Sequence, residues 1–149
     1  MTRVNEHGQP IGEPLDWEPR QPPASVVLEG RWMRLEPLAA GHAEGLYDAL
    51  CGEAHASLWT YRPDEMPTDG GDYARRIAAL AADTESRTWA IVPAGSDTAA
   101  GSLSLLRIFP EQGSAEVAAV IFGPDLQRTT AATEAVVRLG EYVFEELGY

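Results

Sequence analysis

Three apolar, β-prone runs stand close together in the second half of this chain, at Thr88–Val92, Gly101–Ile108 and Ala115–Phe122. The two linkers between them, residues 93–100 and 109–114, are rich in turn-forming residues. Short β-prone runs at this spacing are typical of strands that pair as antiparallel hairpins. The sequence therefore predicts an antiparallel meander.

Helical periodicity appears on both sides of this meander. Residues 42–50 and 72–82 each place their apolar residues on one side of a helix, and the segment between them, including Leu58–Pro63, reads as a loop with aromatic residues. A last helix is predicted over Thr130 to Leu147, with apolar residues at i, i+4, i+7 and i+11 and Gly148 available to end it.

An opening strand is predicted before the first helix. Its two β-prone pieces, Ser25–Leu28 and Trp32–Glu36, are separated by a turn or bulge at Gly30. The predicted order is thus β-α-α-β-β-β-α. Elements in this order imply an α/β or α+β layered domain, in which helices flank a sheet.

The first 24 residues have a different character. Five prolines fall between Met1 and Pro23, and each fixes φ and removes a backbone donor. We expect residues 1–24 to form an extended arm, with Trp17 either anchoring it on the domain or lying in a disordered segment. Residues 25–149 are long enough for one globular domain with its own core.

The charge and the cysteine count exclude several classes of function. With 11 basic and 23 acidic residues the net charge is −12, which argues against a nucleic-acid partner and suits either solubility or cationic amine substrates. Cys51 is the only cysteine, so an internal disulfide and a cysteine-based zinc cluster are excluded, and we expect no bound metal. No run of about 18 apolar residues and no signal peptide is present, so we expect a cytoplasmic protein without a membrane partner.

The most informative stretch joins the last predicted strand to the last helix. Backbone N–H groups that open a helix lack partners, and the helix dipole adds partial positive charge, so such a site suits a pyrophosphate. The small residues 129–132 allow a close approach, Arg128 adds a charge, and Thr129 or Thr130 fits the N-cap. An ordinary capped helix has the same pattern, and the spacing alone leaves both interpretations open.

This stretch resembles the acetyl-CoA motif of the GNAT superfamily of N-acetyltransferases, Gln/Arg-x-x-Gly-x-Gly/Ala. Gln127 stands first, Thr130 occupies the glycine position and Ala132 stands last. The motif continues as Ala-Thr-Glu-Ala over residues 132–135, as in the branch that includes the ribosomal-protein-alanine N-terminal acetyltransferases.

Other segments extend the resemblance over nearly the whole chain. Leu28–Leu38 is similar to the opening strand of that branch, and Val4–Gly12 and Leu58–Tyr61 resemble a bacterial subgroup within it. The resemblance implies a GNAT-like mixed, mostly antiparallel sheet flanked by helices. It also implies transfer of an acetyl group from acetyl-CoA to a primary amine, either a protein N-terminus or a small-molecule amine.

The resemblance further implies roles for particular residues. Backbone groups of Val120, Ile121 and Phe122 would bind the pantetheine arm of acetyl-CoA. The residues that would hold its pyrophosphate are Gln127, Arg128, Thr129, Thr130, Ala131 and Ala132. Threonine at position 130 departs from the family pattern, and a positive φ there would strain its β-branched side chain and weaken cofactor binding.

Two further predictions concern catalysis and the acceptor. The acceptor amine must lose a proton before it attacks, and Glu116 is the candidate base. Strict alternation places Glu116 on the face of Ala118, Val120 and Phe122, but a bulge in this strand would change that parity. Trp59 and Tyr61 are candidates for lining an acceptor pocket, although they would serve equally well as a cover over the core.

The family pattern continues beyond the last helix with a strand, a helix and a hairpin, so the chain is expected to be a C-terminally truncated GNAT domain. Activity would then be impaired, or it would be restored in a homodimer that forms through the exposed sheet edge. A different class of function is a non-enzymatic interaction module that uses this edge to add a strand. An α+β domain that binds another phosphate-bearing ligand is also open.

Overall fold

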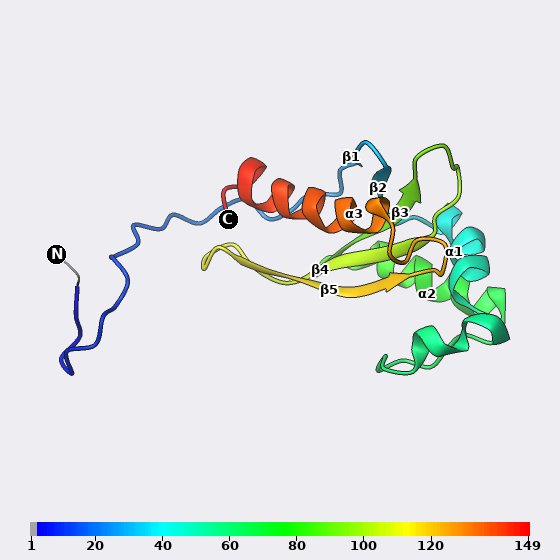
Figure 1. Ribbon diagram of the computed structural model, residues 1–149, viewed down its shortest axis with the longest axis horizontal. Coiled ribbons are helices and arrows are strands. Elements are labelled where there is room, and N and C mark those ends of the chain that lie inside the picture. Colours follow the sequence, from blue (N-terminus) through cyan, green and yellow to red (C-terminus); the bar gives the residue numbers. More distant parts are fainter. Residues whose placement is uncertain (1–2) are drawn as a thin grey trace.

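Five antiparallel strands form the sheet of this protein, and helices cover both of its faces (Figure 1). The computed structural model describes residues 3–149. The strands are β1 Leu28–Glu29, β2 Met33–Pro37, β3 Arg87–Pro93, β4 Gly101–Phe109 and β5 Ser114–Phe122, and each pairs with the next along the chain. The predicted antiparallel meander and the layered fold class are confirmed.

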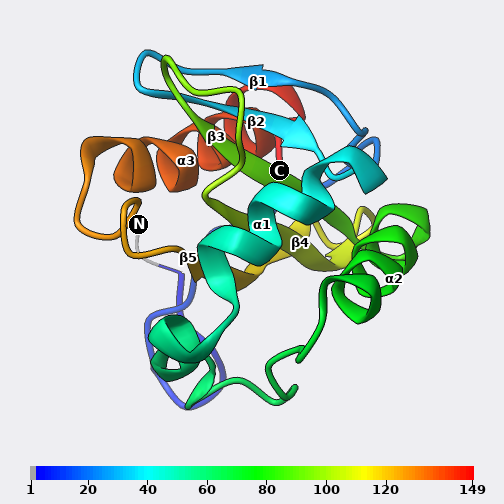
Figure 2. The same cartoon turned by 90° about the vertical axis from the view of Figure 1, so that its right-hand side faces the viewer.

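The helices divide between the two faces, with α3 on one side of the sheet and α1 and α2 on the other (Figure 1 and Figure 2). They are α1 Ala43–Leu50, α2 Gly70–Ala82 and α3 Thr130–Glu141. A π-helical segment, η3 Tyr142–Glu146, continues α3, and 3-10 segments occupy η1 Ala40–His42 and η2 Glu53–Trp59. Segment η2 lies where the sequence predicted a loop.

The sheet has one hydrophobic core on each of its faces. One core lies between the sheet and α3 and is built around Trp89, Ile91, Leu103, Leu105, Ala135 and Leu139. The other lies between the sheet and α1 and α2 and includes Leu46, Leu50, Tyr73, Ile77, Val92 and Ile121. Because successive strand residues point to opposite faces, β3 and β5 contribute to both cores, whereas β1, β2 and β4 contribute only to the core under α3.

The opening strand predicted from the sequence is in fact a hairpin. Strands β1 and β2 pair antiparallel, with Leu28 opposite Leu35, and a turn at Gly30 joins them. The Glu134 carboxylate on α3 accepts hydrogen bonds from the backbone N–H groups of Arg31 at 2.9 Å and Trp32 at 2.6 Å. A side chain on α3 thus satisfies the turn's donors and holds the hairpin against the helix.

Two bulges bend the β4–β5 hairpin. The register shifts between Ser102 and Ser104 and again between Leu106 and Phe109. A residue with positive φ lies in each irregular stretch, Ala119 at 50° and Arg107 at 46°. An extra residue in one strand of a pair reverses the alternation beyond it, so each strand changes its facing pattern part way along.

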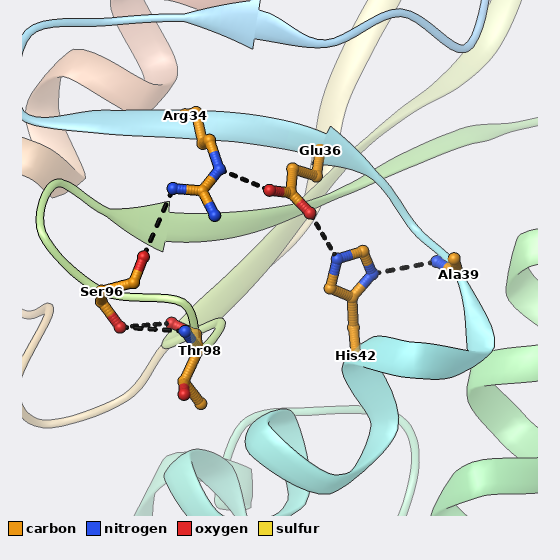
Figure 3. A network of polar contacts seen from close by, with 6 residues as sticks. All are labelled: Arg34, Glu36, Ala39, His42, Ser96 and Thr98. Atoms are coloured by element: carbon orange, nitrogen blue, oxygen red, sulfur yellow. Dashed lines mark hydrogen bonds and ion pairs between the residues drawn. The ribbon is translucent and has the colours of Figure 1, made fainter.

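A polar network fastens the end of β2 to the start of α1 (Figure 3). The Glu36 carboxylate accepts hydrogen bonds from Arg34 Nε and, at 2.9 Å, from His42 Nε2. The backbone N–H of Ala39 donates to His42 Nδ1 at 3.1 Å, which fixes the tautomer with its proton on Nε2. The hydrogen bonds hold the pKa of Glu36 below its usual range, that from His42 first and that from Arg34 second.

Trp17 and Arg20 of the N-terminal arm contact the tip of the β4–β5 hairpin and the segment after α3. Trp17 Nε1 donates to the carbonyl of Pro110 at 3.2 Å, and the Arg20 guanidinium lies 4.8 Å from the centre of its ring. Arg20 Nε also donates to the carbonyl of Gly148 at 3.2 Å. Of the two alternatives given for Trp17, the structure has the one in which it anchors the arm on the domain. Among residues 3–149, no helix combines the length and apolar character that crossing a membrane requires.

Candidate functional site

The turn before α3 leaves a row of backbone donors free. The Thr129 hydroxyl is the N-cap and accepts from the Ala132 N–H at 3.2 Å, while the N–H groups of residues 128–131 donate to no acceptor in the described part of the chain. The first turn of α3 carries no acidic side chain. Free amides and a positive helix terminus together make this turn suited to an anion.

Thr130 is not the strained residue of this turn. It is the first residue of α3, and the positive φ, 59°, belongs to Arg128. The condition under which a β-branched residue at position 130 would be strained, a positive φ, is therefore not met in this chain. Non-glycine residues rarely adopt positive φ, and strain of this kind often accompanies binding loops.

A groove with a volume of about 510 Å³ lies beside the free amides. Its lining residues are Phe122, Gln127, Arg128, Thr129, Ala132, Thr133, Val136 and Val137. Gln127 Nε2 donates to the carbonyl of Phe122 at 3.0 Å, which ties the turn to the end of β5. Five of the residues proposed from the motif and the adjoining strand thus line one groove, and Thr130 and Ala131 lie next to it.

Strand β5 is the edge of the sheet, and no strand pairs with its outer side in the described residues. Val120 is 40% exposed on this edge, whereas Ile121 is buried. Phe122 lines the groove near α3, and Ile121 lines a cavity on the opposite face of the sheet. The end of β5 therefore lies between the groove and the cavity.

That cavity, of about 260 Å³, lies between α2 and the sheet. It is lined from η2 and the segment after it by Trp59, Arg62 and Asp64; from α2 by Tyr73, Arg76, Ile77 and Leu80; and from the sheet by Thr88, Ser102, Ser104, Ala119 and Ile121. Burial raises the pKa of the Tyr73 hydroxyl well above its usual range, which keeps it protonated as a hydrogen-bond donor. The bulge residue Ala119 brings β5 to the cavity wall.

The two predicted acceptor residues lie in different environments. Trp59 lines the cavity and is buried, and its Nε1 donates to the carbonyl of Leu50 at 2.7 Å. Tyr61 is 97% exposed and is not among the lining residues. Trp59 also has the expected covering role, since it belongs to the core under η2.

Glu116 lies on the hairpin outside the cavity. Its carboxylate pairs with Arg107, the bulge residue of β4, and its side chain is 45% exposed. The bulge at Ala119 changes which residues of β5 share a face with Glu116, as expected from the sequence for a strand with a bulge. Glu116 and Ala118 share the face of Ile121, because these three lie opposite Leu106, Ser104 and Ser102, while Phe122 packs on the other face.

Several polar residues of the cavity were not predicted from the sequence. Arg62 and Asp64 form an ion pair at 3.3 Å, and the Arg62 guanidinium lies 5.0 Å from the centre of the Trp59 ring. The only sequence signal was the aromatic loop itself, which places Arg62 three residues after Trp59. Residues 3–149 contain no group of three or more His, Cys, Asp or Glu side chains suited to a metal ion.

Comparisons with known proteins give a consistent result. Residues 33–149 match a family described as an acetyltransferase (GNAT) domain. A GCN5-related N-acetyltransferase from Brucella melitensis has a similar structure, with a TM-score of 0.86 and 32% sequence identity over 90% of this chain. A protein from Chromobacterium violaceum, described as a probable acetyltransferase of the GNAT family, gives a TM-score of 0.83 and 29% identity over 95% of this chain.

The matches cover only part of these relatives. The chain spans 61% of the Brucella protein and 72% of the Chromobacterium protein. A GNAT-family acetyltransferase from Bacillus anthracis, 13% identical with a TM-score of 0.67, shares the fold over 81% of this chain and 68% of its own. No curated protein matched this sequence.

Proposed function

This chain belongs to the GNAT acetyltransferase family, and from that premise we propose that it transfers an acetyl group from acetyl-CoA to a primary amine. The acceptor is a protein N-terminus or a small-molecule amine. The observation that carries this proposal is the row of free amides at residues 128–131, directly beside the groove at the end of β5.

The pyrophosphate of acetyl-CoA fits these amides by charge and by size. Hydrogen bonds between N–H donors and a charged oxygen are stronger than those between neutral groups. Arg128 adds a cation on the same turn, and the small side chains of Ala131 and Ala132 leave room for the anion to approach the backbone. We assign the pyrophosphate contacts to Gln127 and Arg128, to Thr129 and Thr130, and to these two alanines.

The pantetheine arm would run along the free edge of β5. An edge strand offers unpaired N–H and C=O groups, and an extended chain of amides can pair with them as a further strand would. We assign these contacts to Val120, Ile121 and Phe122. The arm would lead the thioester from the groove towards the cavity, since β5 borders both.

Acetyl transfer requires a neutral amine next to the thioester carbonyl. We propose that Glu116 accepts the proton of the ammonium, directly or through water, so that the nitrogen lone pair can attack. The new C–N bond forms as the C–S bond breaks, and the proton that the attacking nitrogen then loses goes to the departing thiolate, which leaves as coenzyme A. We assign to the Val120 N–H the role of stabilising the developing oxyanion.

The acceptor would enter the cavity between α2 and the sheet, with Trp59 in its wall and Tyr61 at the exposed surface of the same segment. A partly enclosed pocket with an aromatic wall and a few polar groups is typical of small-ligand sites. The bulge at Ala119 supports this location because it brings β5 directly to the wall.

Calorimetric titration with acetyl-CoA tests the cofactor assignment. We expect binding of acetyl-CoA in preference to ATP, together with release of coenzyme A when a mixture of primary amines is added. Preference for ATP would instead favour an α+β domain for another phosphate-bearing ligand. Absence of any association with acetyl-CoA would remove the enzymatic proposal.

The open edge of β5 favours a second candidate, association of two copies of the chain. Val117 and Val120 are 41% and 40% exposed on this strand, and an unpaired edge with exposed apolar side chains promotes pairing with another strand. Light scattering after size-exclusion chromatography tests it. A mass that stays monomeric across protein concentrations would exclude both a homodimer and a self-pairing interaction module.

A further inference from the structure

The cavity between α2 and the sheet contains an arginine whose hydrogen-bonding capacity is largely unused. The Arg62 side chain is 22% exposed, and its Nε has no hydrogen-bond partner among the described residues. Among residues 3–149, the Arg62 guanidinium has one ion-pair partner, Asp64, at 3.3 Å from a terminal nitrogen, and one aromatic partner, the face of Trp59. A guanidinium has five N–H donors, so donors of Arg62 remain free for a ligand.

The second arginine of the cavity provides an internal comparison. Arg76 Nε donates to the Asp72 carboxylate at 3.0 Å, and its terminal nitrogens reach Asp72 at 2.9 Å and the carbonyl of Glu65 at 2.9 Å. All three guanidinium nitrogens of Arg76 therefore have acceptors. Arg62 is the cation that remains available, and the buried polar groups of a native site usually find partners.

The rest of the cavity suits a small ligand with an apolar body. Tyr73, Ile77 and Leu80 form an apolar wall along α2. On the sheet side, the hydroxyls of Thr88 and Ser104 lie 2.7 Å apart and share one hydrogen bond, which leaves one of their two protons free to donate. The floor thus offers a donor, whereas Asp64 is the only carboxylate in the lining.

We propose that the acceptor is an amine that also carries a carboxylate, such as an amino acid with an apolar side chain, and that Arg62 binds this carboxylate. The inference rests on the proposed function and narrows its substrate class. The planar guanidinium matches a carboxylate in a bidentate fashion, and its stacking on Trp59 fixes the plane in which it does so.

The overall charge of the protein is compatible with this ligand. A net charge of −12 repels a simple anion, but an amino acid is a zwitterion and carries no net charge at neutral pH. Its amide carries one positive charge and is attracted by the same field. A preference for the acid over the amide must therefore come from a local contact.

Binding of paired probes tests the proposal without acetyl-CoA. The probes are leucine, methionine, phenylalanine and tryptophan, each compared with its C-terminal amide by calorimetry and ligand-observed NMR. We expect at least one acid to bind about tenfold or more tightly than its amide, the difference that one charge-assisted hydrogen bond supports.

Three variants locate the contact. Arg62→Gln should abolish the preference for the acid. Arg62→Lys keeps the positive charge but not the paired N–H donors of the guanidinium, and it should retain only part of the preference. Arg75→Gln is the matched control, because Arg75 lies on α2, is 74% exposed and does not line the cavity; it should behave as wild type. Far-ultraviolet circular dichroism and thermal melting establish that each variant is folded.

The proposal is overturned if no acid binds, if acids and amides bind equally, or if a folded Arg62→Gln or Arg62→Lys protein keeps the full preference. Because these measurements need no acetyl-CoA, they are independent of the cofactor titration. Binding of an acid without binding of acetyl-CoA would sustain the carboxylate site and reject acetyl transfer. The opposite result would sustain the transferase and reject Arg62 as its acceptor contact.

Discussion

The Thr129 hydroxyl accepts a hydrogen bond from the backbone N–H of Ala132 at 3.2 Å, and this bond closes the first turn of α3 while the four preceding amides stay open. The cap and the proposed anion site thus use different donors of the same helix terminus. Changes to one can be separated experimentally from changes to the other.

Removal of the cap should affect stability. Thr129→Ala leaves the Ala132 N–H without its acceptor, and we expect the free energy of unfolding to fall by about 1 kcal/mol. Thr129→Ser keeps the hydroxyl and should stay close to wild type. Urea unfolding followed by circular dichroism measures both, and equal stability of the Ala and Ser variants would show that the cap contributes nothing.

Removal of one free amide should affect acetyl-CoA binding but not folding. Proline is well tolerated as the first residue of a helix, and Thr129, with φ −105° and ψ 163°, already has the conformation that precedes proline. Thr130→Pro should therefore fold normally and bind acetyl-CoA about tenfold more weakly, the expected loss for one charge-assisted bond. Thr130→Ala keeps the amide and serves as the control; identical affinities in the two variants would place the pyrophosphate elsewhere.

Glu116 and Arg107 allow a test of the proposed base, because they form one ion pair. If Glu116 takes the proton of the acceptor, Glu116→Gln should lower kcat about 100-fold or more. Arg107→Gln removes the same ion pair without removing the carboxylate and should retain most activity. Similar losses in both variants would assign Glu116 a structural role only.

The Arg34–Glu36–His42 network predicts a pH-dependent contribution to stability. Hydrogen bonds from His42 and Arg34 lower the pKa of Glu36 in the folded state, so its contribution is present above the unfolded-state pKa and is lost as the pH falls through the folded-state pKa. At neutral pH, Glu36→Gln should unfold with a free energy about 0.5–1 kcal/mol lower than wild type. The difference should close in acid, as urea unfolding at a series of pH values can measure, and a constant difference would contradict this account.

Two glycines should respond in opposite ways to the same substitution. A Cβ on Gly101 would lie 2.6 Å from the carbonyl oxygen of Ile121 and 2.9 Å from Leu126, whereas nothing lies within 4 Å of a Cβ on Gly140. We expect Gly101→Ala to destabilise the protein by about 1–3 kcal/mol through overpacking. Gly140→Ala, inside α3, should stabilise it by about 0.5–1 kcal/mol. Thermal melting measures both variants. A change of the melting temperature in the same direction in both would contradict the predicted effect of the two Cβ atoms.

Periodicity was sufficient to predict the regular elements. The period of 3.6 located α1, α2 and α3 because each buries one apolar stripe, and the β-prone runs located β3, β4 and β5. Short or irregular segments were harder to predict. The segment η2 has no amphipathic stripe long enough to indicate a helix, and only the pairing of Leu28 with Leu35 distinguishes a hairpin from one bent strand.

The candidate site was predicted only where it is continuous in sequence. Residues 127–132 are adjacent in the chain and share one turn, so a motif could identify them. The facing of Glu116 depends on the bulge at Ala119, which alternation does not reveal. Arg62 and Ser104 line the same cavity only because α2 packs across the sheet. No local sequence pattern indicates that two residues so far apart in the chain lie close together.

The core that faces α3 has an implication for synthesis. The apolar faces of β3 and β4 are synthesised before α3, the helix that covers them. The turn at Gly30 likewise lacks its hydrogen-bond acceptor until Glu134 is synthesised, more than a hundred residues later. On the ribosome, where elongation takes on the order of seconds for a segment of this size, the nascent sheet emerges with that face uncovered. Chaperone protection during translation is therefore most needed between completion of β5 and arrival of α3.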